Sequence, residues 1–338
     1  MSSLPVQRGF KQNLRNRVRA YAGTHLRLFR IAQRIMGLAG RFSALFKAPD
    51  REPEMLNHAA RMFATRTSDT QLSSLVFANG KAVAKFNDNT SYHVLPQTPS
   101  LSVALLAGHS HEPECTRLVD RIVKESWTVV DVGANYGWFA VKFSKRAGRS
   151  GRVLAFEPIE RTYAELTDNL LLNECNNVTT LKKALGDRSG NVTFCIPEGV
   201  CGNMGGAGEK GSGGRQEVVE MARLDDLAEL QDLHQVDFIK ADIEGGEFGL
   251  LHGAEKILDR FHPDLLLEMQ LSHTAQFGYA PEEIVHFLGK KGYTGFAVVE
   301  NGEPVKIDFV DDVPMLDLAY NFYFTVNPGR LGSNNAPR

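Results

Sequence analysis

An alternation of short apolar segments with helical segments begins at Trp127 and continues almost to the end of the chain, and it constrains the fold more than any other feature. The apolar segments are rich in β-branched residues and carry few charges, so strands that are buried on both faces are expected. Buried strands separated by helices of about 10–15 residues are typical of a doubly wound, mostly parallel sheet. Seven strands are predicted, at residues 127–132, 152–156, 178–181, 236–241, 265–269, 295–299 and 321–326.

The length of 338 residues suits one large domain of roughly 200–250 residues with an appendage. Within the appendage, residues 74–95 alternate like strands around Asn79-Gly80, a two-residue hairpin signal. A helix is predicted over residues 111–125. The chain therefore divides into a basic arm, a small N-terminal β/α cap, the main domain and a flexible tail, at residues 1–50, 51–125, 126–328 and 329–338.

The net charge of −2 conceals a strong asymmetry, because ten of the 38 Lys and Arg residues and none of the 40 Asp and Glu residues lie in residues 1–49. The remainder therefore carries 28 basic and 40 acidic residues. An acidic body argues against a nucleic-acid partner. The arm predicts an amphipathic helix that lies on an anionic membrane surface or packs on the acidic body. Its apolar stripe recurs every three or four residues, at Leu28, Ile31, Ile35, Leu38, Phe42 and Leu45.

The cysteine pattern indicates a reducing compartment, since Cys115, Cys175, Cys195 and Cys201 form no C-x-x-C pair. No apolar run approaches the ~18 residues that span a bilayer. We expect a cytoplasmic protein, with peripheral membrane contact through the arm. Residues 199–214 contain eight glycines between two strand-like runs, which indicates a hairpin whose long tip is either a substrate lid or an unconstrained surface loop.

The first predicted strand ends in the sequence Asp131-Val132-Gly133-Ala134-Asn135-Tyr136-Gly137. Ligands of doubly wound sheets bind beyond the carboxyl ends of the strands, and glycine lets backbone approach a ligand closely. The spacing is not the G-x-G-x-x-G that holds a pyrophosphate, and the carboxylate would repel phosphate. A cofactor with an ammonium group and no phosphate, such as S-adenosylmethionine, suits this turn better.

Acidic residues follow the next two strands as well. Glu157 ends the second strand, where a carboxylate accepts hydrogen bonds from a ribose diol. Asp187 follows the third strand, where it either accepts from an adenine amino group or forms a turn before Gly190.

The densest cluster of charges lies at the end of the fourth strand, and Glu268 and His273 follow the fifth. Strand alternation places Lys240, Asp242 and Glu244 on the same side of the strand. Such a group can hold a cofactor amine, accept a hydroxyl proton or bind Mg²⁺. The candidate Mg²⁺ ligands are Asp242, Glu244 and Glu268. The cluster consists of Lys240, Asp242, Glu244 and Glu247.

These motifs together resemble the FkbM-type family of S-adenosylmethionine-dependent methyltransferases. The most specific part is K-x-D-x-E-G-x-E at residues 240–247, and the resemblance covers about residues 110–300. It implies a class I methyltransferase fold, and methyl transfer to a hydroxyl of a sugar, a glycolipid or another small metabolite. On that pattern the first-strand turn holds the methionine end of the cofactor through Asp131, Gly133, Ala134, Asn135 and Gly137.

The resemblance also implies that Glu157 holds the ribose and that Asp242 lies beside the reacting methyl group. The candidate bases are Asp242, Glu268 and His273, with Lys240 beside them. Two alternatives stay open: a nucleotide-dependent oxidoreductase on the same kind of sheet, and a non-catalytic scaffold that docks through its basic helix.

Overall fold

The computed structural model describes residues 71–78, 81–94, 111–197, 214–299, 302–307 and 320–331. The basic arm, most of the glycine-rich segment and the end of the predicted tail lie outside these residues, and what was expected of them stays a prediction. The last described element is a 3-10 helix at Pro328–Leu331, which extends the main domain into the segment that was expected to be a tail. No helix in this part of the chain is long and apolar enough to cross a membrane.

The main sheet has eight strands in the order β13-β12-β14-β11-β10-β4-β5-β6. The five strands from β11 to β6 are parallel, and β14 runs antiparallel between β11 and β12. The doubly wound, mostly parallel sheet is therefore confirmed. The strands are β4 Thr128–Val132, β5 Arg152–Phe156, β6 Val178–Leu181, β10 Phe238–Ala241, β11 Asp264–Glu268, β12 Thr294–Val298, β13 Pro304–Lys306 and β14 Asn321–Thr325.

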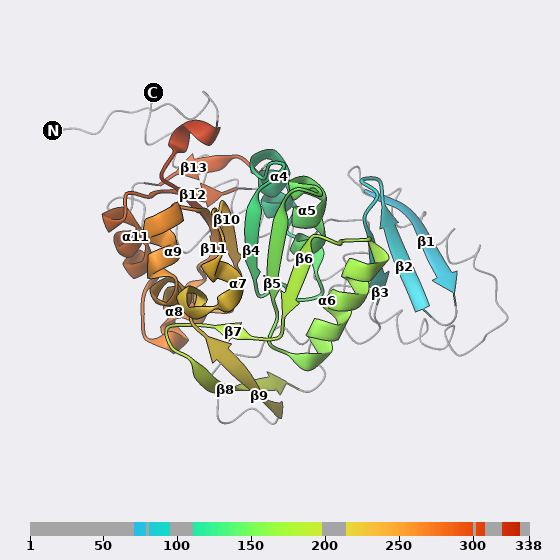
Figure 1. The fold of residues 1–338 in the computed structure, drawn as a ribbon, viewed down its shortest axis with the longest axis horizontal. Coiled ribbons are helices and arrows are strands. Elements are labelled where there is room, and N and C mark those ends of the chain that lie inside the picture. Colours follow the sequence, from blue (N-terminus) through green and yellow to red (C-terminus); the bar gives the residue numbers. More distant parts are fainter. Residues whose placement is uncertain are drawn as a thin grey trace.

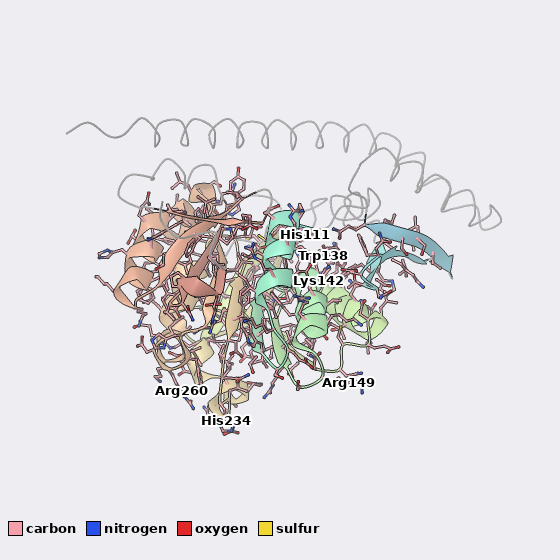
Figure 2. The ribbon with its side chains drawn as sticks, turned by 90° about the horizontal axis from the view of Figure 1, so that it is seen from above. His111, Trp138, Lys142, Arg149, His234 and Arg260 are labelled. Carbon is pink, nitrogen blue, oxygen red and sulfur yellow. The ribbon has the colours of Figure 1, made fainter. Side chains whose placement is uncertain are left out.

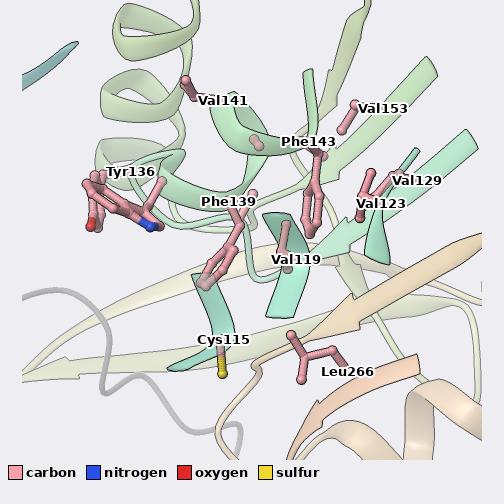
Figure 3. Packing of buried hydrophobic residues seen from close by; sticks show 14 of the residues in the cluster. Cys115, Val119, Val123, Val129, Tyr136, Phe139, Val141, Phe143, Val153 and Leu266 are labelled. Atoms are coloured by element: carbon pink, nitrogen blue, oxygen red, sulfur yellow. The ribbon is translucent and has the colours of Figure 1, made fainter. Parts of the chain in front are cut away.

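Helices cover both faces of this sheet (Figure 1). Because side chains alternate along a strand, Val129 and Phe238 face one core while Val130 and Ile239 face the other. Figure 3 shows part of the first core, in which Phe143 of α5 packs 5.7 Å from Phe238 between ring centroids. The helices are α4 Pro113–Ile122, α5 Trp138–Ala147 and α6 Glu160–Leu172, then α7 Ala228–Gln231, α8 Glu247–Gly253, α9 Glu255–Phe261, α10 Leu271–Thr274 and α11 Pro281–Lys290.

Two features of the sheet and its helices differ from the prediction. The eighth strand, β13, was not predicted, since it is a three-residue edge strand that begins with Pro304 and carries no apolar run. The single helix expected after the fourth strand is two helices, α8 and α9, which meet at Ala254. The end of α8 lies so close to the turn after β7 that a side chain on Gly253 would come within 2.0 Å of the Gly186 carbonyl oxygen.

A small antiparallel sheet of β1 (Leu72–Ala78), β2 (Lys81–Phe86) and β3 (Ser91–Val94) lies beside α6 (Figure 1). Pairing of the last residue of β1 with the first of β2 confirms the predicted hairpin. Asn169 and Asn173 of α6 accept hydrogen bonds from the His93 and Ser91 backbone N–H groups of β3, each over 2.9 Å. Trp138, labelled in Figure 2, stacks on a tyrosine of β3. The cap is therefore fixed to the main domain by side-chain amides and aromatic packing.

A third sheet, in the order β7-β9-β8, lies across the lower edge of the domain in Figure 1. Its strands are β7 (Ala184–Leu185), β8 (Gly190–Pro197) and β9 (Gly214–Ala222). Antiparallel pairing of β8 with β9 confirms the predicted hairpin on either side of the glycine-rich segment.

Candidate functional site

A cavity of about 970 Å³ lies where the carboxyl ends of β4, β5, β10 and β11 face the β7-β9-β8 sheet. Its volume is at the upper end of the range for small-molecule sites, roughly 300–1,000 Å³. The cavity therefore has room for a nucleoside-sized cofactor and a second ligand. Among the predicted site residues that line it are Gly133, Asn135, Glu157, Asp187, Asp242, Glu244 and Glu268.

The turn after β4 is shaped by residues with positive φ. Gly133 has φ +76°, and a Cβ there would lie 2.1 Å from the Asp242 carbonyl oxygen, so only glycine fits. Asn135 adopts φ 52° and lines the cavity. Ala134 and Gly137 do not line the cavity: the first donates its N–H to the Phe156 carbonyl, and the second caps α5. The absence of a side chain at Gly133 therefore lets the turn after β4 lie against the turn after β10 at the cavity.

Glu157 lies at the end of β5, as predicted, with its carboxylate buried at the cavity wall. One oxygen accepts the backbone N–H of Asn135 and the other that of Ile159, each over 3.0 Å. Burial raises the pKa of Glu157 to about 7, although these two hydrogen bonds oppose the shift. Each carboxylate oxygen can accept a further hydrogen bond, so the pair suits a ribose diol.

Asp187 lines the cavity beyond β7, at the position predicted for an adenine edge. Its carboxylate is half-exposed and pairs with the neighbouring Arg188 at 3.2 Å. An adenine amino group that binds the Asp187 carboxylate would therefore compete with Arg188 for it.

Asp131 does not line the cavity, which differs from the role that the resemblance implies for it. The residue is completely buried, and neither carboxylate oxygen has a hydrogen-bond partner among the residues that the structure describes. Burial raises the pKa of Asp131 to about 7, against the opposing charge of Lys240. Register explains its position: Asp131 is the partner of Lys240 on the adjacent strand, and alternation places both side chains on the buried face that Val129 and Phe238 share. Asp131 can therefore influence the cavity only through neighbouring residues such as Lys240, whose charge also acts on Asp242.

Lys240 is buried as well, and it lies outside the cavity lining. Its ammonium group is 3.3 Å from the Asp242 carboxylate and 4.6 Å from the ring centre of Phe139. Burial alone would lower the pKa of Lys240, but Asp242 and other carboxylates raise it above its ordinary value. Burial likewise opposes ionisation of Asp242, yet the charge of Lys240 lowers the pKa of Asp242. Asp242 is thus an ionised carboxylate at the cavity wall.

Glu244 and Glu268, which line the cavity, both lie beside His273. His273 Nδ1 lies 2.8 Å from a Glu244 oxygen and 3.8 Å from a Glu268 oxygen. Burial and the charge of Asp242 raise the pKa of Glu244 to about 7 and that of Glu268 to about 10. His273 itself does not line the cavity, and burial lowers its pKa. At neutral pH, Glu268 is therefore a neutral carboxylic acid.

The predicted Mg²⁺ ligands fit that ion poorly. Within the described ranges, the side chains whose ligand atoms lie within 4.8 Å of one another are Glu244, Glu268 and His273, so the third member is an imidazole and Asp242 is not included. Mg²⁺ prefers all-oxygen sites, whereas an imidazole nitrogen suits transition metals. The geometry therefore does not support the Mg²⁺ site that the sequence suggested.

Two parts of the cavity wall were not anticipated from the sequence. His111 and Glu112, immediately before α4, line it, and Glu112 adopts φ 43°. An aromatic wall is formed by Phe248, Phe277 and Tyr279, and the tyrosine hydroxyl donates to the Gly245 carbonyl over 2.8 Å. The first group was expected to lie within the helix predicted over residues 111–125, but α4 begins only at Pro113. The second comes from segments whose positions depend on tertiary packing.

The sheet order, the glycine turn after β4 and the acidic residue after β5 together define a class I methyltransferase fold. The strand between β11 and β12, β14, comes last in the chain and runs antiparallel to both neighbours, which fits the same class.

Comparison with known proteins then gives the family. The model of the Methyltransferase FkbM domain matches residues 131–294, which confirms the resemblance to this family over that part of the chain. Methyltransferase sdnD of Sordaria araneosa is 27% identical over 194 residues, which cover 49% of this chain and 73% of that protein. Hexuronic acid methyltransferase AglP of Haloferax volcanii is 29% identical over 147 residues, 44% of this chain and 58% of that protein.

Among solved structures, a methyltransferase FkbM from Methylobacillus flagellatus KT matches with a TM-score of 0.40 and 15% identity. The match covers 79% of this chain and 58% of that one.

Proposed function

We propose that this chain transfers a methyl group from S-adenosylmethionine to a hydroxyl group of a sugar, free or within a glycan or glycolipid. The observation that carries the proposal is a cavity lined both by the turn after β4 with Glu157 and by further carboxylates with aromatic rings. We assign the first group of residues to a cofactor half and the second to an acceptor half that suits a polyhydroxylated ligand.

The cofactor half is supported by the turn after β4 and by Glu157. Glycine at 133 lets this turn pack against the Asp242 carbonyl beside the cavity, and each oxygen of Glu157 can accept one further hydrogen bond. When bound, S-adenosylmethionine supplies a methyl group on a positively charged sulfur. An ionised Asp242 and the neighbouring Glu244 favour a positive charge in this region.

The acceptor half is supported by its aromatic wall. Phe248 and Tyr279 lie 5.2 Å apart between ring centroids, and Phe277 is 40% exposed at the cavity. Sugars present an apolar C–H face beside their hydroxyl groups, so aromatic rings next to carboxylates match both properties. The name of the relative AglP, a hexuronic acid methyltransferase, agrees with a sugar acceptor.

In the proposed reaction the acceptor oxygen forms a bond to the methyl carbon while the methyl–sulfur bond breaks. The hydroxyl proton passes to the Asp242 carboxylate, which Lys240 holds in place. Glu268, protonated at neutral pH, donates a hydrogen bond rather than accepting the proton. His273 lies beside the two glutamates, with Nδ1 at 2.8 Å from Glu244 and 3.8 Å from Glu268, and is not the base in this scheme. Positioning and exclusion of water contribute most of the rate enhancement in such a displacement.

Two measurements test the proposal. Calorimetry should show that S-adenosylhomocysteine binds and that Glu157→Ala weakens this binding at least about tenfold, the loss of a hydrogen-bonded charge. Incubation with methyl-labelled S-adenosylmethionine and a panel of sugars and glycolipids should then yield labelled methyl ethers. Absence of cofactor binding, or label found only in RNA or protein, contradicts the proposal.

A further inference from the structure

The proposed proton acceptor and two rings of the aromatic wall belong to different parts of the chain. Asp242 is fixed to the main sheet: its N–H donates to the Val132 carbonyl over 3.1 Å, and its carboxylate lies 3.3 Å from the Lys240 ammonium group. Phe277 and Tyr279 follow α10 and lie outside the sheet. The distance between the base and a sugar that stacks on these rings therefore depends on how the second segment is joined to the first.

The join lies at the turn between β10 and α8, residues 242–246, where Gly245 adopts φ 101°. The Tyr279 hydroxyl donates to the Gly245 carbonyl over 2.8 Å. A Cβ on Gly245 would lie 2.7 Å from the His273 carbonyl oxygen and 2.8 Å from the Phe277 ring, so the two segments also touch directly. A hydrogen bond and a close packing contact therefore connect the aromatic wall to the turn.

Glu247, the first residue of α8, holds the same turn from within the core. One oxygen of its buried carboxylate accepts the Ile243 N–H over 2.9 Å, and the other lies 3.5 Å from the Tyr279 hydroxyl. The Tyr279 ring packs on Phe248, 5.2 Å away between centroids. Burial and the nearby Glu247 raise the pKa of Tyr279 above its ordinary value, so the hydroxyl keeps its proton and acts as a donor. Tyr279 therefore lines the cavity with its ring while its hydroxyl is bonded to the turn.

We propose that Tyr279 is a positioning residue, whose hydroxyl fixes the distance between a sugar on the aromatic wall and the Asp242 carboxylate. The inference rests on the methyl transfer proposed above and concerns the same site. Such a transfer needs the reacting atoms about 3–3.5 Å apart and in line, and a displacement of about 1 Å can cost about a hundredfold in rate. Loss of the hydroxyl leaves the ring for stacking but lets the wall shift, so the sugar still binds and reacts more slowly.

Tyr279→Phe in the whole chain removes the hydroxyl and keeps the ring. Turnover is measured with methyl-labelled S-adenosylmethionine and the sugar or glycolipid that the parent protein methylates fastest. We expect kcat to fall at least about tenfold, while KM for that acceptor and the dissociation constant of S-adenosylhomocysteine change less than about threefold. Tyr293→Phe is the matched control, because Tyr293 is a buried tyrosine whose hydroxyl has no hydrogen-bond partner among the described residues. Its kcat should stay within about twofold of the parent value.

A second comparison separates positioning from a general structural effect. If Tyr279 acts through the alignment of the acceptor with Asp242, its hydroxyl matters little once the proton acceptor is absent. In an Asp242→Asn background, Tyr279→Phe should therefore change kcat less than about threefold, against at least about tenfold in the parent protein. A merely structural role gives the same factor in both backgrounds.

Amide hydrogen exchange tests the join without any acceptor. The Ile243 and Gly246 N–H groups donate within the turn, to the Glu247 carboxylate and the Ile243 carbonyl. Tyr279→Phe should raise their exchange rates at least about tenfold and leave those of β4 unchanged, whereas Tyr293→Phe should leave both unchanged.

Unchanged exchange in the turn overturns the inference, and so does an unchanged kcat or a kcat that falls by the same factor in both backgrounds. Failure of the parent protein to methylate any sugar or glycolipid is instead the failure of the proposed function. The exchange measurement then decides by itself whether the Tyr279 hydroxyl holds the turn.

Discussion

Lys240 and Asp131 are register partners on adjacent parallel strands, and both are buried beneath the cavity. The same ammonium group lies 3.3 Å from the Asp242 carboxylate at the cavity wall. The Lys240 ammonium group therefore acts on two carboxylates. The oxygens of Asp131 have no hydrogen-bond partner among the described residues, and Asp242 lines the cavity. Asp242, the proposed proton acceptor, is therefore held by Lys240, a residue outside the cavity lining.

Replacing Lys240 with methionine should be strongly destabilising, since it leaves Asp131 and Asp242 without a cation. We expect the free energy of unfolding at pH 7, measured in urea, to fall by about 3–5 kcal/mol. Asp131→Asn in the same background should recover part of this loss. Lys124→Met, at an exposed position, should change stability by less than about 0.5 kcal/mol. Equal effects of the two lysine substitutions would contradict the assignment.

Gly133→Ala should abolish cofactor binding, because its Cβ would lie 2.1 Å from the Asp242 carbonyl oxygen at φ +76°. The strained backbone alone costs about 1–3 kcal/mol, and relieving the clash must displace the β10 turn. Calorimetry with S-adenosylhomocysteine and urea unfolding measure the two effects. Gly289→Ala is the control: it lies within α11, has nothing within 4 Å of the added Cβ, and should stabilise the protein by about 0.5–1 kcal/mol.

Asp225→Ala should lower stability without changing the site. The two carboxylate oxygens of Asp225 accept the backbone N–H groups of Lys256 and Ile257, each over 3.0 Å, at the start of α9. Loss of such a cap costs about 1–2 kcal/mol of unfolding free energy. The adjacent Asp226 is half-exposed and pairs only with Arg223, so Asp226→Ala should cost less than about 0.5 kcal/mol. Reduced affinity for S-adenosylhomocysteine in Asp225→Ala would show a functional role instead.

The strands of the sheet could be predicted because their chemistry is local. Arg152–Phe156 and Val178–Leu181 have the predicted bounds, since each is an apolar or β-branched run between polar turns. Strand ends then locate a site, and Glu157 and Asp242 were found in this way. The resemblance to the FkbM-type family specified S-adenosylmethionine as the cofactor, whereas the glycine spacing after the first strand only favoured a cofactor of that kind.

The position of a side chain relative to the cavity could not be predicted in the same way. Asp131 belongs to the same motif as Gly133, yet strand alternation and the register with Lys240 turn it toward the buried core. His111 and Phe277 reach the cavity from segments about 165 residues apart, and His111 packs there against aromatic rings at the start of α5. Such placement depends on tertiary contacts that no local pattern in a single sequence records.

Glu247→Gln should make stability less dependent on pH. Glu247 is buried, accepts the Ile243 N–H over 2.9 Å, and burial raises its pKa to about 8. Its pKa in the unfolded chain is near ~4.3, so folding favours the protonated form. The stabilising contribution is complete below that value and is lost as the pH rises through 8. Glutamine keeps the acceptor oxygen and does not titrate.

The stability of Glu247→Gln relative to the parent protein should therefore rise steadily between pH 5 and 8.5, as measured by urea unfolding. Glu125→Gln, at an exposed position, should show no such trend. A difference that stays constant with pH would mean that Glu247 is ionised in the folded protein.

Asp242→Asn and Glu268→Gln should separate the two carboxyl groups of the proposed mechanism. Lys240 lowers the pKa of Asp242 despite its burial, so asparagine removes the group that receives the proton, and kcat should fall by about 10²–10⁴. Burial raises the pKa of Glu268 to about 10, so it is already neutral at pH 7 and glutamine preserves a hydrogen-bond donor. We expect less than about a tenfold loss of kcat there. Both variants should bind S-adenosylhomocysteine. Turnover retained in Asp242→Asn and lost in Glu268→Gln would reverse the two roles.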